Sequence, residues 1–161
     1  MPGRLWPRHL RIKRRKRGKP LRHRGVESLE EREAALGAGA ADQMRIDKAH
    51  FEAQLAQRLP GVEIVGAGAD RLWNTVSAIM PETPDCRQRW VVKLDKLGFA
   101  VSTGSACASG KEQVSHVLDA IGLTIDSASR VLRFSGGWST VSDDWNSLLG
   151  GLMKAYTEFT R

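Results

Sequence analysis

The stretch STGSACASG, residues 102–110, is the part of the chain whose composition points most directly to chemistry. Cys107 has only Ser, Gly, Ala and Thr around it, whereas a buried structural cysteine usually has large apolar neighbours. Such a run cannot build a core or hold a strand face, so we expect a pliable loop that presents one thiol. Loop composition alone leaves two interpretations open, a reactive nucleophile and an incidental cysteine in a flexible loop.

The second cysteine, Cys86, follows the segment PETPD at an expected helix start, and we interpret it as a surface or half-buried thiol. The chain has neither a C-x-x-C pair nor Cys/His ligand spacing, so we expect no metal site. Nothing in the sequence indicates an oxidising compartment, and we expect both thiols to be reduced.

The formal net charge of +7 conceals two different parts of the chain. Residues 1–25 contain 11 Lys or Arg and no Asp or Glu, which leaves 14 basic and 18 acidic residues, a net charge of 14 − 18 = −4, in residues 26–161. We predict a disordered basic leader over residues 1–25. Short basic clusters are weak evidence for nucleic-acid binding, so we favour a solvated tail and keep binding through the leader as an alternative. The abrupt change in composition also suggests a leader that arises from a shifted reading frame or a misplaced start.

The length of 161 residues and 41% hydrophobic composition predict one domain with a core, over residues 26–161. No apolar run approaches the length of a membrane helix, and no apolar signal segment follows the charged start. We therefore expect a soluble, cytoplasmic protein that does not enter membranes.

Hydrophobic periodicity and turn residues predict the order helix, two strands, helix, strand, helix, strand, helix. The expected ranges are helices at 26–59 broken at GAGA (37–40), strands at 62–65 and 72–80, a helix at 86–98, a strand at 99–102, a helix at 112–123, a strand at 129–137 and a helix at 141–159. In the first helical region Phe51, Leu55 and Leu59 recur every four residues, and we place Ile46 near the same face. This order predicts an α/β domain, a small sheet covered by helices.

Two segments, AVSTGSACASGKEQVSHVLDAIGL (100–123) and RVLRFSGG (130–137), closely resemble the C-terminal part of cysteine desulfurases. These are enzymes that use pyridoxal phosphate and have the class V aminotransferase fold. RLWNT (71–75) is similar to the R-L-P-N-T of the family. The resemblance extends over about residues 26–161 and is sharpest from 98 to 137. It implies the C-terminal small domain of fold-type I pyridoxal-phosphate enzymes.

Carried over position by position, the resemblance implies that Cys107 is the catalytic nucleophile, which takes sulfur from L-cysteine as a persulfide and passes it to an acceptor protein. It implies that Arg133 binds the substrate carboxylate, a task that suits a planar bidentate donor. It also implies a homodimer. We give no chemical role to His116, nor to His50, which we interpret as an ordinary helix-surface histidine.

The chain also departs from the family pattern. The S-x-H-K lysine that anchors pyridoxal phosphate has no counterpart, and Lys93, Lys96, Lys111 and Lys154 are expected to be solvated. We therefore expect a truncated enzyme that does not catalyse desulfuration alone, with a non-catalytic persulfide carrier or interaction module as the alternative. Trp73 and Trp138 replace the Pro and Arg of the family pattern. They suggest a divergent branch whose substrate is related to cysteine, such as selenocysteine or a sulfinate.

Overall fold

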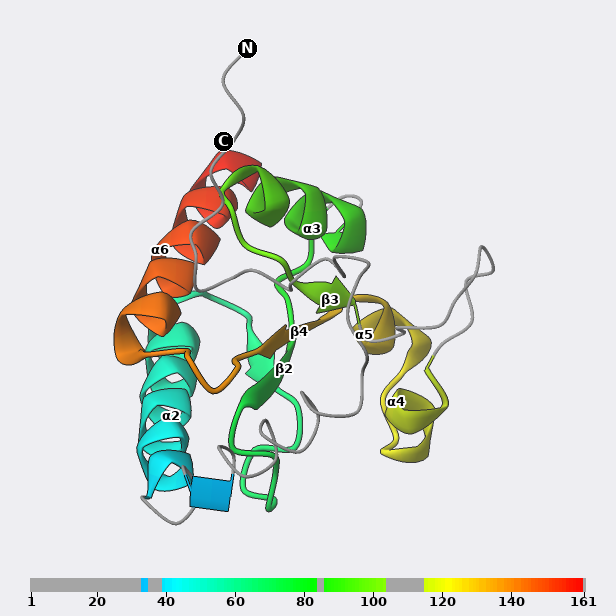
Figure 1. Cartoon of the computed structure of the whole chain (residues 1–161). Coiled ribbons are helices and arrows are strands. Elements are labelled where there is room, and N and C mark those ends of the chain that lie inside the picture. The colour runs from blue at the N-terminus through cyan, green and yellow to red at the C-terminus, as the bar shows by residue number, and fades with distance from the viewer. Residues whose placement is uncertain (1–32, 35–38, 84–85, 104–114, 161) are drawn as a thin grey trace, which may run out of the picture.

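The computed structural model describes residues 33–34, 39–83, 86–103 and 115–160, and the fold is given for these (Figure 1). We call the stretch STGSACASG (102–110) the cysteine segment. The leader (residues 1–25) and residues 104–114, which include most of the cysteine segment, lie outside the described residues. The elements are α2 (Ala40–Arg58), β1 (Glu63–Ile64), β2 (Thr75–Ile79), α3 (Cys86–Lys96), β3 (Ser102–Thr103), α4 (His116–Ala120), α5 (Ile125–Ser129), β4 (Val131–Ser135) and α6 (Ser142–Phe159). None of the described helices is both long and apolar enough to cross a membrane.

The four strands form one antiparallel sheet in the order β1-β2-β4-β3. The central pair, β2 and β4, is aligned along its whole length, from Thr75 opposite Ser135 to Ile79 opposite Val131. The two outer strands are short: β1 pairs with the end of β2, and β3 pairs with the middle of β4. All of the pairing therefore depends on the two central strands.

Helices α2, α3 and α6 pack on one face of this sheet, where they bury the main core (Figure 1). Side chains that alternate along the two central strands supply the sheet side of the core, because successive residues of a strand point to opposite faces. The helices contribute large side chains that are almost completely buried: Phe51, Leu55 and Leu59 from α2 and the loop after it, Trp90 and Leu94 from α3, and Leu149 and Leu152 from α6. The predicted α/β sheet with a helical cover is confirmed.

The short helices α4 and α5 cover only one end of the opposite face (Figure 1). There Leu118 of α4 and Ala128 of α5 pack against Ile79 and Val131, which are a cross-strand pair. The helix predicted over 112–123 is thus observed, in the described part, as the short α4. The second helix, α5, was not predicted, because its five residues are too few to show a helical period. The Thr124 hydroxyl caps it by accepting the Ser127 N–H at 3.2 Å.

Two further sequence predictions are wrong in detail. Ile46 is 61% exposed, because it lies five residues before Phe51 and therefore roughly 140° around the helix from it. Asp47 continues the buried face instead, and its carboxylate accepts hydrogen bonds from Gln43 (2.9 Å) and from Ser142 of α6 (2.7 Å). The strand predicted at 99–102 begins only at Ser102.

A glycine-dependent turn joins α3 to the segment that leads into β3. Gly98 has φ 93°, a conformation that glycine adopts without strain. Its N–H donates to Asp95 O at 3.0 Å, and the Phe99 N–H donates to Leu94 O at 2.9 Å. This is the Schellman arrangement, in which backbone donors beyond the helix satisfy the last carbonyls. The turn brings Phe99 back toward the end of α3, and the chain then continues to β3.

Adjacent glycines in α6 provide a matched test of this packing. A Cβ at Gly151 would lie 2.7 Å from Phe99 Cε2, whereas a Cβ at Gly150 would meet nothing within 4 Å. Gly150→Ala should stabilise the protein by about 0.5–1 kcal/mol through helix propensity. Gly151→Ala has the same propensity gain but overpacks the ring, so it should be less stable than Gly150→Ala by about 1–3 kcal/mol. Urea unfolding midpoints measure the difference, and equal stability of the two variants would contradict the close contact of α6 with Phe99.

Candidate functional site

Arg133 lies in the middle of β4, on the face of the sheet that α2, α3 and α6 do not cover. Its neighbours Leu132 and Phe134 are buried in the main core, so strand alternation directs Arg133 to the other face. The residue is half-buried. Within the part of the chain that the structure describes, its side chain has no ion pair or hydrogen-bond partner.

Two serines lie directly opposite Arg133 on the neighbouring strands. Ser77 of β2 and Ser102 of β3 are both its Cα partners in the register, so the three residues form one row across the sheet. The next row on the same face is also polar, with the Thr75 and Ser135 hydroxyls 3.4 Å apart. A guanidinium has five N–H donors in a planar fork, and hydroxyls beside it add further donors. The row could therefore bind a carboxylate or a similar planar anion.

The sequence pointed to Arg133 as a candidate site residue but gave no sign of Ser77 and Ser102 beside it. The alternation of apolar and polar residues along β4 was visible in the sequence. The residues that face Arg133 were not, because they depend on the register between strands far apart in the chain.

Cys107 lies outside the described residues, as does Lys111, so the structure gives no geometry for the predicted nucleophile. The first two residues of the cysteine segment are placed. Ser102 and Thr103, which form β3, pair with Arg133 and Leu132 of β4. Only three residues separate Thr103 from Cys107 in the sequence. The described structure thus places the start of the cysteine segment beside the strand that carries Arg133.

Cys86 differs from its predicted surface or half-buried position, because it is buried in the main core at 9% exposure. It begins α3, and its thiol donates to Pro81 O at a sulfur–oxygen distance of 3.4 Å. Cys86 is therefore a packing residue of the core, in the same apolar cluster as Trp90 and Leu94. The predicted exposed positions of His50 and Lys154 are confirmed, and His116 is exposed at the start of α4.

Trp73 and Trp138, the two tryptophans that depart from the family pattern, pack against each other. Their ring centroids are 4.7 Å apart, with a tilt of 48° between the ring planes. The turns that carry them are joined by two hydrogen bonds, from Asn74 Nδ2 to Gly136 O (2.9 Å) and from Gly136 N to Asn74 O (2.8 Å). The two departures are therefore one contact, which lies where β2 begins and β4 ends.

Arg71, the first residue of RLWNT, ties the turn before β2 to α2. Its guanidinium donates through both terminal nitrogens to the two carboxylate oxygens of Glu52, each at 2.8 Å. The side-chain hydrogen bond to Glu52 raises the pKa of Arg71 above its ordinary value, against the opposing effect of burial. Arg71 thus stays charged at any ordinary pH and anchors the turn that carries Trp73.

The described lysines do not form a site for pyridoxal phosphate. Lys48 is only 8% exposed, and its ammonium donates to Leu72 O at 3.1 Å. Lys93, predicted to be solvated, forms an ion pair with Glu158. Lys96 and Lys154 are exposed on helix surfaces. Each of these four lysines is thus either paired or exposed on a helix surface, and none is placed to hold an aldehyde cofactor.

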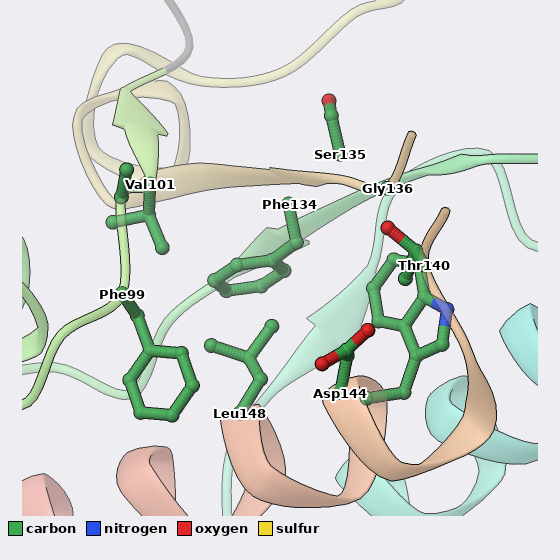
Figure 2. A pocket seen from close by; sticks show the side chains of 10 residues that line it. Phe99, Val101, Phe134, Ser135, Gly136, Thr140, Asp144 and Leu148 are labelled. Carbon is green, nitrogen blue, oxygen red and sulfur yellow. The ribbon is translucent and has the colours of Figure 1, made fainter. Parts of the chain in front are cut away.

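A small pocket of about 40 Å³ lies on the core side of the sheet (Figure 2). Phe99, Val101, Phe134 and Leu148 form its apolar part, and Thr140 and Asp144 lie at the other end. The Asp144 carboxylate accepts the Val141 N–H at 3.0 Å and so caps the start of α6. The pocket is too small for a cofactor, and it faces away from Arg133. Among the described residues, no group of His, Cys, Asp and Glu is arranged to hold a metal ion.

The fold of the described residues matches part of two larger solved structures. A NifS-like protein from Rickettsia africae has the same fold over 73% of this chain and 29% of its own, with a TM-score of 0.61 and 23% identity. A second solved NifS-like protein matches with a TM-score of 0.60 and 21% identity, over 73% of this chain and 28% of its own. No family model matches the chain.

Sequence comparison identifies the family. A cysteine desulfurase of Cereibacter sphaeroides is 33% identical over 112 residues, which are 69% of this chain and 28% of that protein. The cysteine desulfurase IscS of Dictyoglomus turgidum is 33% identical over 100 residues, 62% of this chain and 25% of that protein. The chain is a relative of the cysteine desulfurases, and it spans about a quarter of the length of these curated relatives.

Proposed function

We propose that this chain corresponds to the C-terminal part of a pyridoxal-phosphate-dependent cysteine-desulfurase-like enzyme. In this proposal L-cysteine, or a related amino acid, is the substrate. Its sulfur is transferred to Cys107 as a persulfide, and Cys107 then passes the sulfur to an acceptor protein. The observation that carries the proposal is the pairing of Ser102 and Thr103 with β4, because it brings the start of the cysteine segment beside Arg133. Four residues of chain span at most about 14 Å, so Cys107 stays within reach of this strand.

Arg133 is the residue that we propose binds the substrate carboxylate. It is half-buried and has no ionic partner among the described residues, so its charge is available to a ligand. Ser77 and Ser102 flank it in the register and can donate hydroxyl hydrogen bonds to the same carboxylate. A bidentate guanidinium contact would fix the orientation of the amino acid.

Cys107 is the proposed sulfur-accepting group. Its thiolate attacks the outer sulfur of a donor persulfide, so that a new sulfur–sulfur bond forms on Cys107. The sulfur–sulfur bond of the donor breaks, and the donor leaves as a thiolate with the electron pair. The thiolate is the reactive form of a cysteine, and an ordinary cysteine thiol has a pKa of about 8.5. This step needs no cofactor and belongs to the alternative in which the chain is a persulfide carrier. Transfer from L-cysteine would break a carbon–sulfur bond instead, with alanine as the leaving product, and would require the cofactor.

Carboxylate binding at Arg133 is testable on the chain with L-alanine, the amino acid left after sulfur is removed from L-cysteine. L-alanine should shift the NMR signals of Arg133 and its row neighbours, while L-alaninamide, which lacks the carboxylate, should not. Arg133→Lys keeps the charge but loses the planar fork, and its affinity should fall by roughly tenfold. Equal shifts with the two ligands would contradict the proposed role of Arg133.

The two cysteines form a matched pair for testing sulfur transfer. After exposure to a small-molecule persulfide donor, intact-mass spectrometry should show one added sulfur atom on the wild-type chain. Cys86→Ser should keep this adduct, because the Cys86 thiol is buried and donates to Pro81 O. Cys107→Ser should lose it. An adduct that persists in Cys107→Ser and disappears in Cys86→Ser would refute the assignment.

The chain alone should not release alanine from L-cysteine when pyridoxal phosphate is added. The reason is that no described lysine is placed to hold the cofactor, and the chain spans about a quarter of its curated relatives. Amino-acid analysis of the reaction mixture measures alanine directly. Enzyme-dependent alanine release that a cofactor-free control lacks would show that the chain is an active desulfurase.

A further inference from the structure

Helix α3 and the C-terminal end of α6 pack side by side (Figure 1). A hollow outside the candidate site lies between them. We call it the α3–α6 hollow. It is lined by Gln88, Arg89, Val92, Lys93 and Lys96 of α3 and by Phe159 of α6. The residues of α3 recur at helical spacing, so they form one continuous stripe on its outer surface.

The charge of this hollow is opposite to that of the domain around it. Residues 26–161 carry a net charge of −4, from 14 basic and 18 acidic residues, yet all three charged side chains that line the hollow are cations. Lys93 is paired with Glu158, which leaves Arg89 and Lys96 as the cations whose charge is not offset by an ion pair in the described part of the chain. Asp95 is exposed on the same helix, beside the stripe. The hollow is therefore a local positive patch on an acidic domain.

Arg89 is held in place without using its hydrogen-bond donors. Its guanidinium carbon lies 4.7 Å from the centroid of the Phe159 ring, a cation–π contact. The Phe159 ring in turn packs edge-on against Trp90, with the ring centroids 4.9 Å apart. The guanidinium is thus positioned by the core through two aromatic rings, and its N–H groups stay available to an anionic partner.

The hollow also offers apolar surface between its charges. Val92 is 52% exposed at the centre of the stripe, and Phe159 is only half-buried. Protein interfaces commonly combine aromatic and arginine side chains with a central apolar contact. A partner that matches this surface needs carboxylates for the two cations and one apolar side chain between them.

We propose that the α3–α6 hollow binds an acidic segment of a partner protein. Carboxylates of the segment bind Arg89 and Lys96, and an apolar side chain packs on Val92 and Phe159. The proposal does not depend on sulfur transfer or on Cys107.

A nucleic acid fits the α3–α6 hollow less well. Arg89 and Lys96 are seven residues apart on α3, about 10 Å along the helix. A longer polyanion would extend from them past Asp95, which is exposed beside the stripe and repels it.

The test uses the full chain with ¹⁵N labelling and a synthetic Glu-rich peptide that carries leucine at every fourth position. NMR reads each residue separately, so shifts in the hollow are distinguished from binding to the basic leader. The peptide should shift the α3 amides from Gln88 to Lys96, and the matched peptide with Gln in place of Glu should not. Lys96→Glu and Arg89→Glu should each weaken the affinity measured at these amides by at least about tenfold.

Lys154→Glu is the matched control, because Lys154 is exposed on α6 outside the hollow and the substitution changes the net charge equally. It should alter the affinity at the α3 amides by less than about twofold, since separated surface charges are largely screened. The proposal is overturned if the α3 amides do not respond to the Glu peptide. It is also overturned if all three variants weaken binding equally, or if a thymidine oligonucleotide binds the hollow more tightly than the peptide.

Discussion

The antiparallel pairing of β2 with β4 is the interaction on which the rest of the structure depends. Both outer strands and both layers of helices attach to this pair. On one face it supplies the apolar side chains over which α2, α3 and α6 close. On the other face the same alternation leaves Arg133 and its hydroxyl neighbours outside the main core. One ladder of hydrogen bonds thus determines both the stability of the domain and the position of its candidate site.

The ends of the sheet are held by contacts between turns. Arg71 binds Glu52 of α2, Asn74 and Gly136 exchange two hydrogen bonds, and the two tryptophans pack together beside them. Because these contacts all lie where β2 begins and β4 ends, they support the register that places Ser77 opposite Arg133. The tryptophan pair is a structural element of the sheet end, which gives a physical reason for both departures from the family pattern.

The relationship to cysteine desulfurases concerns a part of those enzymes. The described structure contains a row that can bind a carboxylate and the start of the cysteine segment, but no lysine placed for pyridoxal phosphate. In the proposed function, binding of the substrate carboxylate and transfer of sulfur would lie on this part, and activation of the substrate by the cofactor would lie elsewhere. The basic hollow between α3 and α6 lies apart from the site, on another surface of the same domain.

The sequence by itself determined the types of the elements other than α5, the buried face of α2, and the family resemblance. Periods of two and 3.6 residues depend only on local order along the chain, so Phe51, Leu55 and Leu59 could be predicted as core residues. Ile46 and Cys86 were misplaced, because the exposure of a residue at the edge of a face depends on what packs there. Only the tertiary structure decided that Ser77 and Ser102 flank Arg133, that Trp73 meets Trp138, and that Arg89 rests on Phe159. The physical reason is that strand alternation specifies a face but not a partner, and partners are chosen by long-range register and packing.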